Sequence, residues 1–462
     1  MSSSKQRIAS LPYFPDSSLL FSAIAQRPWS VFLDSGYPYS TQGRYDIIAA
    51  DPICTLVTHG DKTIITRDDL TYISVQDPFS LVKEQLLPEL TGFAELPFTG
   101  GAIGYFSYDL ARRLENLSVI AEDAELIAEM AVGIYQWALI VDHQEQQSFL
   151  VGHDCQEGLW QDLIIQFSQL SELKAPAAFT VLSNISSNMT QAAYTQAFDR
   201  IKYYLKEGDC YQVNLTQRFV ANCKGEPWAA YQKLREQNAA PFSCYLNLPE
   251  VQILSSSPER FLKLTQGQVE TKPIKGTRPR KQDELEDQQQ IASLEASAKD
   301  RAENLMIVDL LRNDISKTCI KGSVKVPVIF EVESYATVHH LVSTITGTLT
   351  EDQHACDLLK SCFPGGSITG APKIRSMEII EELEPHRRGV YCGAIGYIGF
   401  NGNMDTNIAI RTLVHSNNTI RFWAGGGIVY DSKLEEEYQE SFDKASAMLI
   451  LLEQLTEKHD SH

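Results

Sequence analysis

The sequence predicts a mixed α/β fold of the α+β kind, in which a β-rich first half is followed by a second half that mixes helices and strands. Short apolar or β-branched segments separated by turn residues indicate the strands, and longer segments with helical periodicity indicate the helices. A chain of 462 residues is also too long for one small core. We therefore expect two or three domains, or one large α/β unit with an extension.

The first half contains most of the short predicted strands. They are the apolar or β-branched segments at residues 45–50, 55–58, 63–66 and 134–142. Residues 171–188 are rich in Ser, Ala and Asn and form the best candidate for a linker. We therefore divide the chain into an N-terminal β-rich region, residues 1–185, and a second region, residues 186–455.

A helix opens the second region. Its apolar side chains recur at helical spacing, at Tyr194, Phe198, Ile201 and Leu205. Thr190 can cap the start of this helix and Gly208 can end it. Residues 211–215 then alternate as in a strand.

The remainder of the second region contains both element types. Long helices are predicted at residues 291–311 and 435–452, and glycine-rich strands at residues 393–400, 408–414 and 420–424. The last two strands are expected to join through Asn417-Asn418.

The composition excludes several classes of function. A net charge of −19 disfavours a nucleic-acid partner, because the average surface would repel polyphosphate. Nine cysteines without a Cys-x-x-Cys pair fit the reduced thiols of a cytoplasmic enzyme better than disulfides or a zinc site. No signal-peptide pattern is present, and no apolar run approaches the roughly 18 residues of a membrane span. We therefore expect a soluble cytoplasmic protein without a membrane partner.

Lys275 is the candidate nucleophile. It lies in the segment Pro-Ile-Lys-Gly-Thr (273–277), where the proline stiffens the chain and the glycine permits a close approach to another surface. A lysine amine becomes a good nucleophile when burial or cationic neighbours lower its pKa. Four basic residues are near in sequence: Lys272, Arg278, Arg280 and Lys281. A solvated basic loop is the alternative.

Two predicted helices carry an acidic stripe. One stripe consists of Lys299, Asp300 and Glu303, and the other of Glu437, Glu440 and Lys444. Carboxylates that face each other from two helices repel unless a cation lies between them, and hard oxygen ligands suit Mg²⁺. Two solvated helix faces are the alternative.

Two glycine-rich segments could bind anions. Residues 363–372 end with a proline at the expected first position of a helix, where free N–H groups favour a carboxylate or a phosphate. Residues 424–427 follow a predicted strand and could form a similar nest. Simple turns are the alternative. Since each segment is near a lysine (Lys373 and Lys444), a small dianionic ligand is worth considering.

Two further residues could handle protons. Glu259 ends the strand-like segment Ser-Ser-Ser-Pro-Glu (255–259), and His340 adjoins an apolar stretch. The glutamate could act as a general acid or base, and the histidine could orient a group or transfer a proton. A surface turn and a hydrogen-bonded core histidine are the alternatives.

Seven segments in order resemble a known family. They are Ser-Pro-Glu-Arg-Phe (257–261), Pro-Ile-Lys-Gly-Thr (273–277), Ala-Glu-Asn-Leu-Met-Ile-Val-Asp-Leu-Leu-Arg-Asn-Asp (302–314), His-His-Leu-Val-Ser (339–343), Pro-Gly-Gly-Ser-Ile-Thr-Gly-Ala-Pro-Lys (364–373), Ala-Gly-Gly-Gly-Ile (424–428) and Glu-Tyr-Gln-Glu (437–440). Together they are similar to the chorismate-utilising enzymes, strongly over residues 190–455. The resemblance implies the fold of that family, with large antiparallel β-sheets packed as a sandwich and helices on the outside.

Position 275 indicates which members of the family the chain resembles. Anthranilate synthases carry a small residue between Pro-Ile and Gly-Thr, whereas bacterial aminodeoxychorismate synthase component I carries lysine, as here. Isochorismate and salicylate enzymes use a lysine base near the position of Gln212. The resemblance is therefore to aminodeoxychorismate synthase component I. It implies conversion of chorismate and ammonia to 4-amino-4-deoxychorismate, for p-aminobenzoate and folate synthesis.

The resemblance also implies catalytic roles. Lys275 would attack C2 of chorismate while the 4-hydroxyl departs, and Glu259 would protonate that hydroxyl. His340 would complete the catalytic group. Ammonia, supplied by a separate glutaminase subunit, would then add at C4 and expel the lysine.

Ligands follow from the same resemblance. Mg²⁺ would be held by Glu303 and Glu440, with Glu437 beside them. The substrate would contact Thr277, Gly366, Ser367, Tyr391, Arg411, Gly425, Gly426, Gly427 and Lys444.

Relatives also bind tryptophan between the two halves, as an inhibitor in anthranilate synthases and as a buried structural ligand in some aminodeoxychorismate synthases. The matching positions here are Ser35, Gly43, Arg44, Tyr45, Pro241, Phe242 and Ser243. Because residues 36–44 depart from the family pattern, the resemblance leaves tryptophan binding open.

Two other functions remain open from the sequence. The closest alternative is an anthranilate synthase component I, which would eliminate pyruvate and release an aromatic product. The other is a catalytically inactive homologue that serves as a tryptophan-binding or scaffold subunit. A decayed site should lose some of its functional residues, so the joint presence of Lys275, Glu259, Glu303, Glu440 and His340 argues against inactivity.

Overall fold

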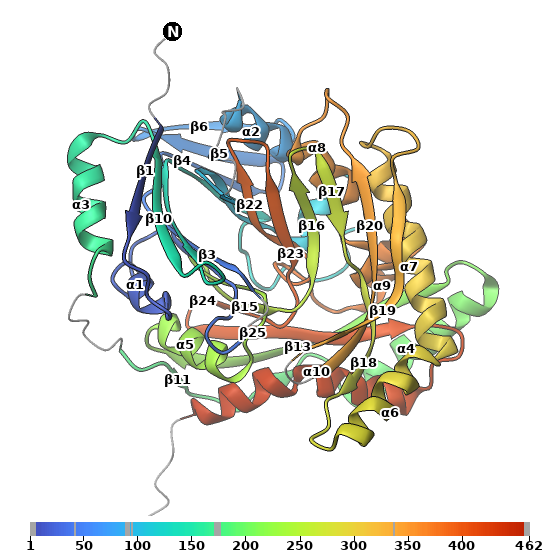
Figure 1. Ribbon diagram of the computed structural model, residues 1–462. Coiled ribbons are helices and arrows are strands. Elements are labelled where there is room, and N and C mark those ends of the chain that lie inside the picture. The colour runs from blue at the N-terminus through green and yellow to red at the C-terminus, as the bar shows by residue number, and fades with distance from the viewer. Residues whose placement is uncertain are drawn as a thin grey trace, which may run out of the picture.

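Two large antiparallel β-sheets form the centre of the protein, and helices cover their outer faces (Figure 1). The computed structural model describes residues 6–40, 43–87, 93, 96–170, 177–335 and 338–456. The predicted α+β class, with antiparallel sheets packed as a sandwich and helices outside, is therefore confirmed.

The first sheet has 13 strands. Its main path runs β1 (Gln6–Leu11), β10 (Gln147–His153), β9 (Trp137–Asp142), β3 (Tyr45–Ala49), β2 (Ser30–Asp34), β14 (Phe242–Asn247), β15 (Gln252–Ser257), β24 (Thr412–Ser416), β25 (Thr419–Ile428), β13 (Gln212–Lys224) and β11 (Thr180–Val181). The short strands β12 (Ser186–Ser187) and β21 (Gly370–Ala371) also pair with β13.

The second sheet has 12 strands. Its main path runs β18 (Ile274–Pro279), β20 (Val338–Thr348), β17 (Gln268–Thr271), β16 (Arg260–Thr265), β23 (Met404–Ile408), β22 (Ala394–Gly399), β7 (Gly101–Phe106), β8 (Met130–Tyr135), β4 (Cys54–His59), β5 (Lys62–Arg67) and β6 (Leu70–Ser74). The strand β19 (Lys325–Ser334) pairs with the free side of β20. Both sheets thus take strands from residues 1–185 and from residues 186–455. The division of the chain near residue 185 stays a prediction, and strands from the two regions are hydrogen-bonded to one another in both sheets.

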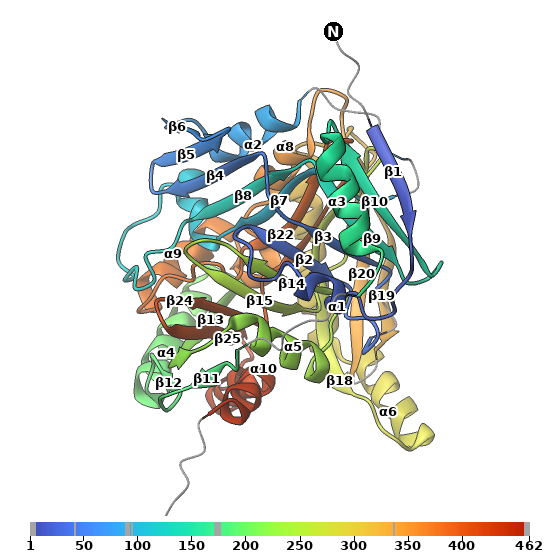
Figure 2. The ribbon, with the colours of Figure 1, turned by 90° about the vertical axis from the view of Figure 1, so that its left-hand side faces the viewer.

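Helices lie on both outer sides of this sandwich. The ten α-helices of the described residues are α1 (Ser18–Ser22), α2 (Pro78–Leu86), α3 (Glu157–Phe167), α4 (Gln191–Glu207), α5 (Pro227–Gln237), α6 (Glu284–Glu295), α7 (Ala298–Ser316), α8 (Ala355–Cys362), α9 (Lys373–Leu383) and α10 (Leu434–Gln454). Two 3₁₀ helices, η1 (Tyr108–Arg113) and η2 (Gly366–Ile368), connect other elements. Figures 1 and 2 show α3 along β10 and α10 beneath the long strands β13 and β25.

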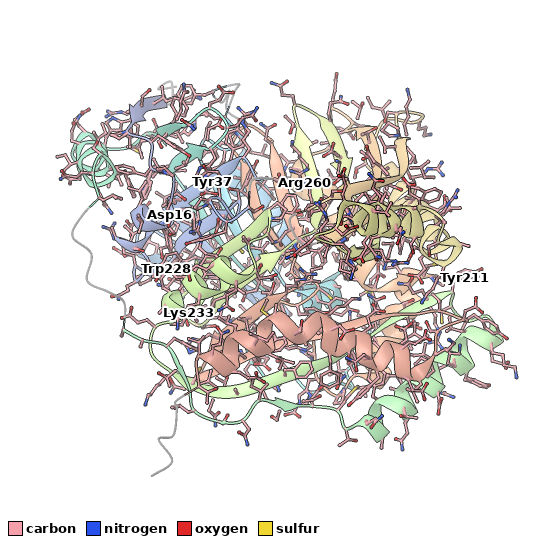
Figure 3. All side chains as sticks on the ribbon, turned by 60° about the horizontal axis from the view of Figure 1, so that its bottom comes forward. Asp16, Tyr37, Tyr211, Trp228, Lys233 and Arg260 are labelled. Atoms are coloured by element: carbon pink, nitrogen blue, oxygen red, sulfur yellow. The ribbon has the colours of Figure 1, made fainter. Side chains whose placement is uncertain are left out.

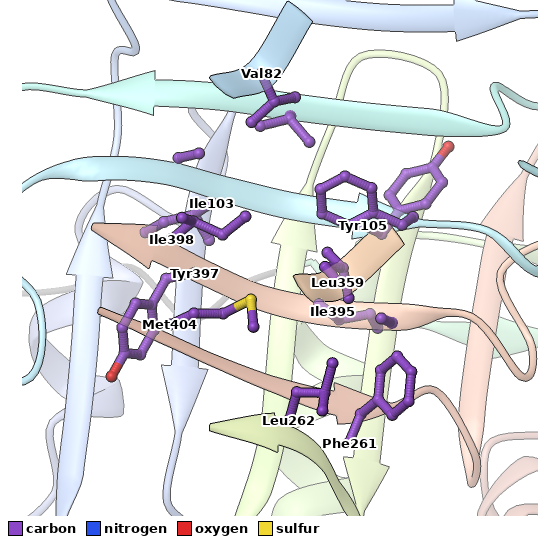
Figure 4. Close-up of a cluster of buried hydrophobic side chains, with 14 of the residues drawn as sticks. Val82, Ile103, Tyr105, Phe261, Leu262, Leu359, Ile395, Tyr397, Ile398 and Met404 are labelled. Carbon is purple, nitrogen blue, oxygen red and sulfur yellow. The ribbon is translucent and has the colours of Figure 1, made fainter. Parts of the chain in front are cut away.

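Strands of the first sheet are buried on both faces. Successive side chains of a strand point to opposite faces, and on β2 Val31 belongs to the core between the sheets while Phe32 belongs to the core under the helices. Ile47 and Ile48 of β3 divide in the same way. In the second sheet, side chains of β7, β22 and β23 pack with Val82 of α2 (Figure 4). The strands β7 and β22 are accordingly apolar along their whole length rather than alternating.

Several predicted elements are confirmed. Thr190 caps α4 by accepting a hydrogen bond from the N–H of Ala193, and Gly208 ends the helix with a φ of 82°. The helix predicted at residues 435–452 is α10. Asn417 and Asn418, both with positive φ, connect β24 to β25 as predicted.

Three predicted elements are wrong because the structure divides them. The helix predicted at residues 291–311 is two helices, since Ser297 caps a new helix by accepting from the N–H of Asp300. The strand predicted at residues 134–142 separates at Gln136 into β8 and β9, which lie in different sheets. The strand predicted at 408–414 is interrupted by Arg411, whose φ of 49° is incompatible with an extended chain. Part of the predicted linker, residues 171–176, lies outside the described residues.

The chemical expectations from composition can be compared with the structure. All nine cysteines are buried free thiols, as the absence of a disulfide pattern predicted. Among the described residues, no helix is both long enough and apolar enough to cross a membrane.

Candidate active site

Lys275 lies on β18 at an irregularity of the β18–β20 pair. The register shifts between Ile274 and Thr277, and Gly276 in that interval has a φ of 82°. A Cβ atom at Gly276 would lie 2.8 Å from Leu294 and 2.9 Å from Asp300, so the segment requires glycine for both conformation and space. Such a bulge redirects side chains. The Nζ of Lys275 donates a hydrogen bond to the carbonyl oxygen of Ser367 over 3.1 Å.

Ser367 also contacts the predicted proton donor. Its hydroxyl donates to Oε1 of Glu259 over 2.8 Å, and Glu259 is buried between β15 and β16 with 7% of its surface exposed. Burial raises the pKa of the Glu259 carboxyl, although the Ser367 hydrogen bond and the ammonium groups of Lys275 and Lys444 oppose this effect. A raised carboxyl pKa increases the protonated fraction that a general acid requires.

The pKa of Lys275 is shifted in the direction that nucleophilic attack requires. Burial lowers this pKa, and the nearby ammonium of Lys444 lowers it further, whereas the carboxylates of Glu303, Glu259 and Glu440 oppose the shift. The lowered pKa increases the fraction of neutral amine at pH 7.

The cation that acts on Lys275 comes from a different part of the sequence than we expected. Lys272 pairs with Glu333 over 3.0 Å and Arg278 pairs with Asp300 over 3.0 Å. Arg280 pairs with a carboxylate of α6 over 2.9 Å. Three of the four basic residues near Lys275 in sequence are therefore paired with carboxylates, and none of the four is among the main influences on its pKa. Lys444, on the last helix, has this role in the structure.

His340 lies opposite Thr277 in the β18–β20 pair, and Nδ1 of His340 lies 2.9 Å from the Thr277 hydroxyl. Burial and the positive charge of Arg411 lower the pKa of His340 to about 4. The imidazole is therefore neutral at pH 7. It can hold Thr277 in position, but a protonated imidazole is not its resting form.

Tyr391 and Arg411 are two further predicted substrate contacts, and the charge of Arg411 acts on His340. Tyr391 is buried and stacks on Trp423 at a centroid distance of 6.0 Å, which fixes its ring. Burial lowers the pKa of Arg411, and within the described part of the chain no carboxylate forms an ion pair with its guanidinium. An unpaired guanidinium in a partly buried position suits the carboxylate of a small molecule.

The predicted acidic faces do meet. Glu303 projects from α7, and Glu437 and Glu440 project from α10. The Nζ of Lys299 lies 4.0 Å from Oε1 of Glu303 and 3.9 Å from Oε1 of Glu437, so one ammonium bridges the two helices. Figure 3 views the molecule from this side, with α10 crossing the front.

The three carboxyl groups differ in their pKa shifts. Burial raises the pKa values of Glu303 and Glu437, and the negative charge of Glu440 adds to both shifts. Burial alone would also raise the pKa of Glu440, but the ammonium of Lys444, 2.6 Å from its Oε1, outweighs burial and lowers it. Lys444 is therefore paired with a predicted metal ligand.

These side chains fit a magnesium ion as part of its ligands. Among the described residues, no three carboxylate, imidazole or thiol groups converge closely enough to hold a metal ion alone. Mg²⁺, however, is usually held by one or two carboxylates together with water and substrate oxygens. A Cβ at Gly426 would lie 3.2 Å from an oxygen of Glu437 and 3.2 Å from an oxygen of Glu440, so glycine there leaves room around the two carboxylates.

The two glycine-rich segments differ from the predicted anion nests. Residues 425–427 lie inside β25 and pair with Thr216, Leu215 and Asn214 of β13, so the expectation that they follow the strand is wrong. A Cβ at Gly425 would lie 2.0 Å from the carbonyl oxygen of Leu215, which explains why the ladder requires glycine. The carbonyl of Gly425 accepts a hydrogen bond from Lys444 over 3.1 Å.

In the other segment, Gly366 and Ser367 lie in the short helix η2, and the carbonyl of Ser367 accepts the hydrogen bond from Lys275. Pro372 caps α9 rather than beginning it. The Nζ of Lys373 pairs with Asp314 over 2.6 Å, so Lys373 is not the basic residue of an anion nest, contrary to the prediction.

All seven residues predicted for tryptophan binding line one cavity of about 730 Å³ between the two sheets. They are Ser35, Gly43, Arg44, Tyr45, Pro241, Phe242 and Ser243. Ile274 lines this cavity while its neighbour Lys275 contacts Ser367, so β18 separates the cavity from the candidate site. Sequence reasoning missed Arg260, Lys272, Glu333 and Tyr335 of the cavity wall. The position of Arg260 directly after Glu259 in a family motif was the available signal.

A comparison with protein families agrees with this geometry. The family described as "chorismate binding enzyme" matches residues 31–450. The chain belongs to the chorismate-binding enzyme family. Its described site therefore lies within the matched part of the chain.

Members of the chorismate-binding family with known names are similar over almost the whole chain. Aminodeoxychorismate synthase component 1 of Escherichia coli (strain K12) is 50% identical over 439 residues, which cover 94% of this chain and 95% of the relative. Aminodeoxychorismate synthase component 1 of Bacillus subtilis (strain 168) is 36% identical over 457 residues, 96% of each chain. Anthranilate synthase component 1 of Aquifex aeolicus (strain VF5) is 35% identical over 443 residues, 92% of this chain and 89% of the relative.

Solved structures agree with the fold. Anthranilate synthase component I from Streptococcus pneumoniae TIGR4 has a TM-score of 0.75 and 31% identity, covering 89% of this chain and 93% of that one. MenF, the menaquinone-specific isochorismate synthase from Escherichia coli, has a TM-score of 0.73 and 18% identity, covering 97% and 95%. The second likeness concerns the fold alone.

Proposed function

We propose that the protein is component 1 of an aminodeoxychorismate synthase and converts chorismate and ammonia to 4-amino-4-deoxychorismate. The observation that carries this proposal is the group formed by Lys275, Ser367 and Glu259. The backbone carbonyl of Ser367 contacts the amine of Lys275, whose pKa is lowered. The hydroxyl of Ser367 contacts the carboxyl of Glu259, whose pKa is raised. The 50% identity to a relative of this name supports the same reaction.

The first step joins Lys275 to the substrate. The neutral amine adds to C2 of chorismate, both ring double bonds shift by one position, and the C4–oxygen bond breaks. Glu259 donates the proton with which the 4-hydroxyl leaves as water, so the carboxyl becomes a carboxylate. The amine passes one proton to water when its new bond forms, and Glu259 regains a proton from water before the next turnover.

The second step returns the enzyme to its starting state. Ammonia adds to C4 and loses one proton, both ring double bonds shift back, and the bond between C2 and Lys275 breaks. The departing lysine takes up a proton, and the amino group occupies the carbon that carried the hydroxyl. Two displacements of this kind explain how a nucleophile at C2 gives a product substituted at C4.

The charged groups around Lys275 are suited to hold a dianion. Arg411 can bind one carboxylate of chorismate, and Tyr391 can support it with a hydrogen bond. Glu303 and Glu440, with Glu437 beside them, would hold Mg²⁺. When bound, this ion supplies charge neutralisation for the ring carboxylate and withdraws electrons from the ring.

The proposal includes a partner and a location. The name component 1 of the relatives implies a second component, and we propose a glutaminase subunit that supplies ammonia. The product would enter p-aminobenzoate and folate synthesis. Nine free thiols support a cytoplasmic location.

A tryptophan site is the second part of the proposal. The cavity between the sheets contains the face of Phe242, with the guanidinium of Arg260 4.8 Å from its ring centre, and the half-buried ring of Tyr45. Aromatic and charged side chains that line one cavity suit an aromatic amino acid. We propose that L-tryptophan binds there.

Intact-mass spectrometry tests the proposed reaction most directly. The protein is mixed with chorismate and Mg²⁺ in the absence of ammonia and quenched in acid. A covalent adduct whose mass equals chorismate minus one water is expected, and peptide mapping should place it on Lys275. Absence of an adduct, together with anthranilate fluorescence after ammonia is added, would favour an anthranilate synthase component 1 instead.

A further inference from the structure

Three lysine ammonium groups surround the carboxylates of the candidate site, and they are held in different ways. Lys275 donates to the carbonyl of Ser367 and Lys444 donates to the carbonyl of Gly425, each over 3.1 Å. These two lysines therefore have backbone anchors that do not depend on the carboxylates. Lys299 is different, because in the described part of the chain it contacts only the side chains of Glu303 and Glu437.

The position of Lys299 is that of a bridge. Glu303 is four residues further along the same helix, α7, whereas Glu437 belongs to α10. The two oxygens lie 4.0 Å and 3.9 Å from the same Nζ, and the side chain is 52% exposed. Ion pairs of this length at an exposed lysine are weak, and the flexible stem can turn into solvent without disturbing the core.

The carboxylates that Lys299 contacts are better anchored than the lysine. Glu437 is 4% exposed, and its Oε1 accepts a hydrogen bond from the hydroxyl of Ser432 over 2.6 Å. Glu303 is 17% exposed on a helix that packs on β20 and β18. When these contacts open, Lys299 therefore moves, while Glu303 and Glu437 stay in place.

We infer that Lys299 competes with the divalent cation for the carboxylates of α7 and α10, so that cation binding displaces its ammonium. The inference rests on the proposed Mg²⁺ site. A magnesium ion binds oxygen ligands at about 2.1 Å, which places it closer to Glu303 than the ammonium lies now. Two cations beside the same partly buried oxygens repel each other, and the lysine is the one that can leave.

A purely structural role for Lys299 makes the opposite prediction. If the lysine only holds α7 and α10 together, its removal separates Glu303 from the acids of α10, and the protein binds a divalent cation less tightly or equally well. If the lysine competes with the cation, its removal tightens binding. The sign of the change in affinity therefore distinguishes the two roles.

The experiment measures Mn²⁺ binding to the full-length protein without chorismate, by the electron paramagnetic resonance signal of free Mn²⁺, with Mg²⁺ added as a competitor. The variants are Lys299→Met, Lys299→Arg and Lys433→Met. Lys433 is the matched control, because it is an exposed lysine at the start of α10 that pairs with Glu436, 2.7 Å away. Its replacement changes the net charge equally without touching Glu303 or Glu437.

We expect Lys299→Met to bind Mn²⁺ about fivefold more tightly than the wild type. A fivefold change in Kd corresponds to about 1 kcal/mol. Lys299→Arg keeps the charge and should stay within about twofold of the wild type, as should Lys433→Met.

Unchanged or weaker binding in Lys299→Met overturns the inference, and so does an equal gain in Lys433→Met, which would show a general effect of charge. If the wild type binds Mn²⁺ normally in either case, the proposed metal site stands and only the role of Lys299 is wrong. If the wild type does not bind Mn²⁺, both the metal site and the inference fail.

Discussion

The hydroxyl of Ser367 donates a hydrogen bond to Oε1 of Glu259 over 2.8 Å, and this contact joins the loop before α9 to the end of β15. The carbonyl of the same serine accepts a hydrogen bond from Lys275. The proposed acid and the proposed nucleophile are therefore positioned by one residue. Displacement of this serine should disturb both groups together.

Lys275→Ala should reduce the formation of aminodeoxychorismate by at least about a thousandfold, because the covalent route is lost. The measurement is turnover with chorismate, Mg²⁺ and ammonia, with the product identified by mass. Lys281→Ala, an exposed lysine of the following turn, is the control and should retain the wild-type rate. A comparable rate in Lys275→Ala would refute the nucleophile role.

Ser367→Ala should shift the pH dependence of kcat/KM. The Ser367 hydrogen bond lowers the pKa of Glu259 against the effect of burial, so loss of this hydrogen bond should raise the pKa further. Glu259 then stays protonated to higher pH. The fall of kcat/KM on the alkaline side of the pH profile, where Glu259 loses its proton, should therefore move to higher pH. Ser361→Ala on α8 serves as the control. A limb that stays in place or moves to lower pH contradicts the assignment of Glu259 as the acid.

Glu303→Gln and Glu440→Gln should each remove the response of turnover to Mg²⁺ along with most of the activity. An amide lacks the negative charge that a hard divalent cation requires. Glu436→Gln changes an exposed acid of the same helix that pairs with Lys433, and its Mg²⁺ titration should match the wild type. A site variant that titrates normally with Mg²⁺ argues that its carboxylate is not a ligand.

Asp46→Asn should destabilise the wall of the cavity proposed to bind tryptophan. Asp46 is fully buried, contacts Nε2 of His143 at 2.8 Å and accepts from the N–H of Ser35 over 2.7 Å. Burial alone would raise the pKa of Asp46, but the His143 contact and two further hydrogen bonds outweigh it and lower the pKa. The carboxylate thus contributes stability above its unfolded pKa of about 4, and this contribution is lost as pH falls through the lower folded value.

We expect Asp46→Asn to lose about 2–4 kcal/mol of unfolding free energy at pH 7, measured by urea denaturation. The difference from the wild type should shrink when the same measurement is made at low pH. Asp61→Asn, in the exposed turn between β4 and β5, should match the wild type at both values. An equal deficit at pH 7 and at low pH would mean that the charge of Asp46 is not what stabilises this wall.

Tryptophan should raise the midpoint of thermal unfolding. A ligand at about one hundred times its Kd stabilises the folded state by about 2.7 kcal/mol, which a melting curve resolves. Phe242→Ala should lose this response because the ring that lines the cavity is removed. Leucine at the same concentration is the control ligand. Mass analysis of the denatured protein would also detect tryptophan that is retained during purification.

The local chemistry of the sequence predicted many elements correctly. Thr190 caps the start of α4 and Gly208 ends it, as the capping rules predict. Asn417-Asn418 forms the predicted connection between β24 and β25. Where local signals compete, prediction failed. Residues 291–311 contain good helix formers throughout, so the cap at Ser297 was not visible beside them. The break at Arg411 was invisible too, because its positive φ is imposed by the strands on either side.

The glycine triplet was placed wrongly for a related reason. A run of glycines is typical of a turn, yet residues 425–427 form ladder hydrogen bonds with β13, a strand about 210 positions earlier. No local pattern reports that a distant carbonyl will lie 2.0 Å from a hypothetical Cβ of Gly425. Close packing between separate elements requires this glycine.

The sequence by itself determined which groups the site contains, because ordered motifs with fixed residue types identify Lys275, Glu259, Glu303 and Glu440 without coordinates. Only the tertiary structure decided which charges act on one another. Lys444 rather than the neighbouring basic residues lowers the pKa of Lys275, and Lys299 connects Glu303 to Glu437. Electrostatic interactions depend on distance and burial, and both are set when the chain brings α7, α10 and β18 together.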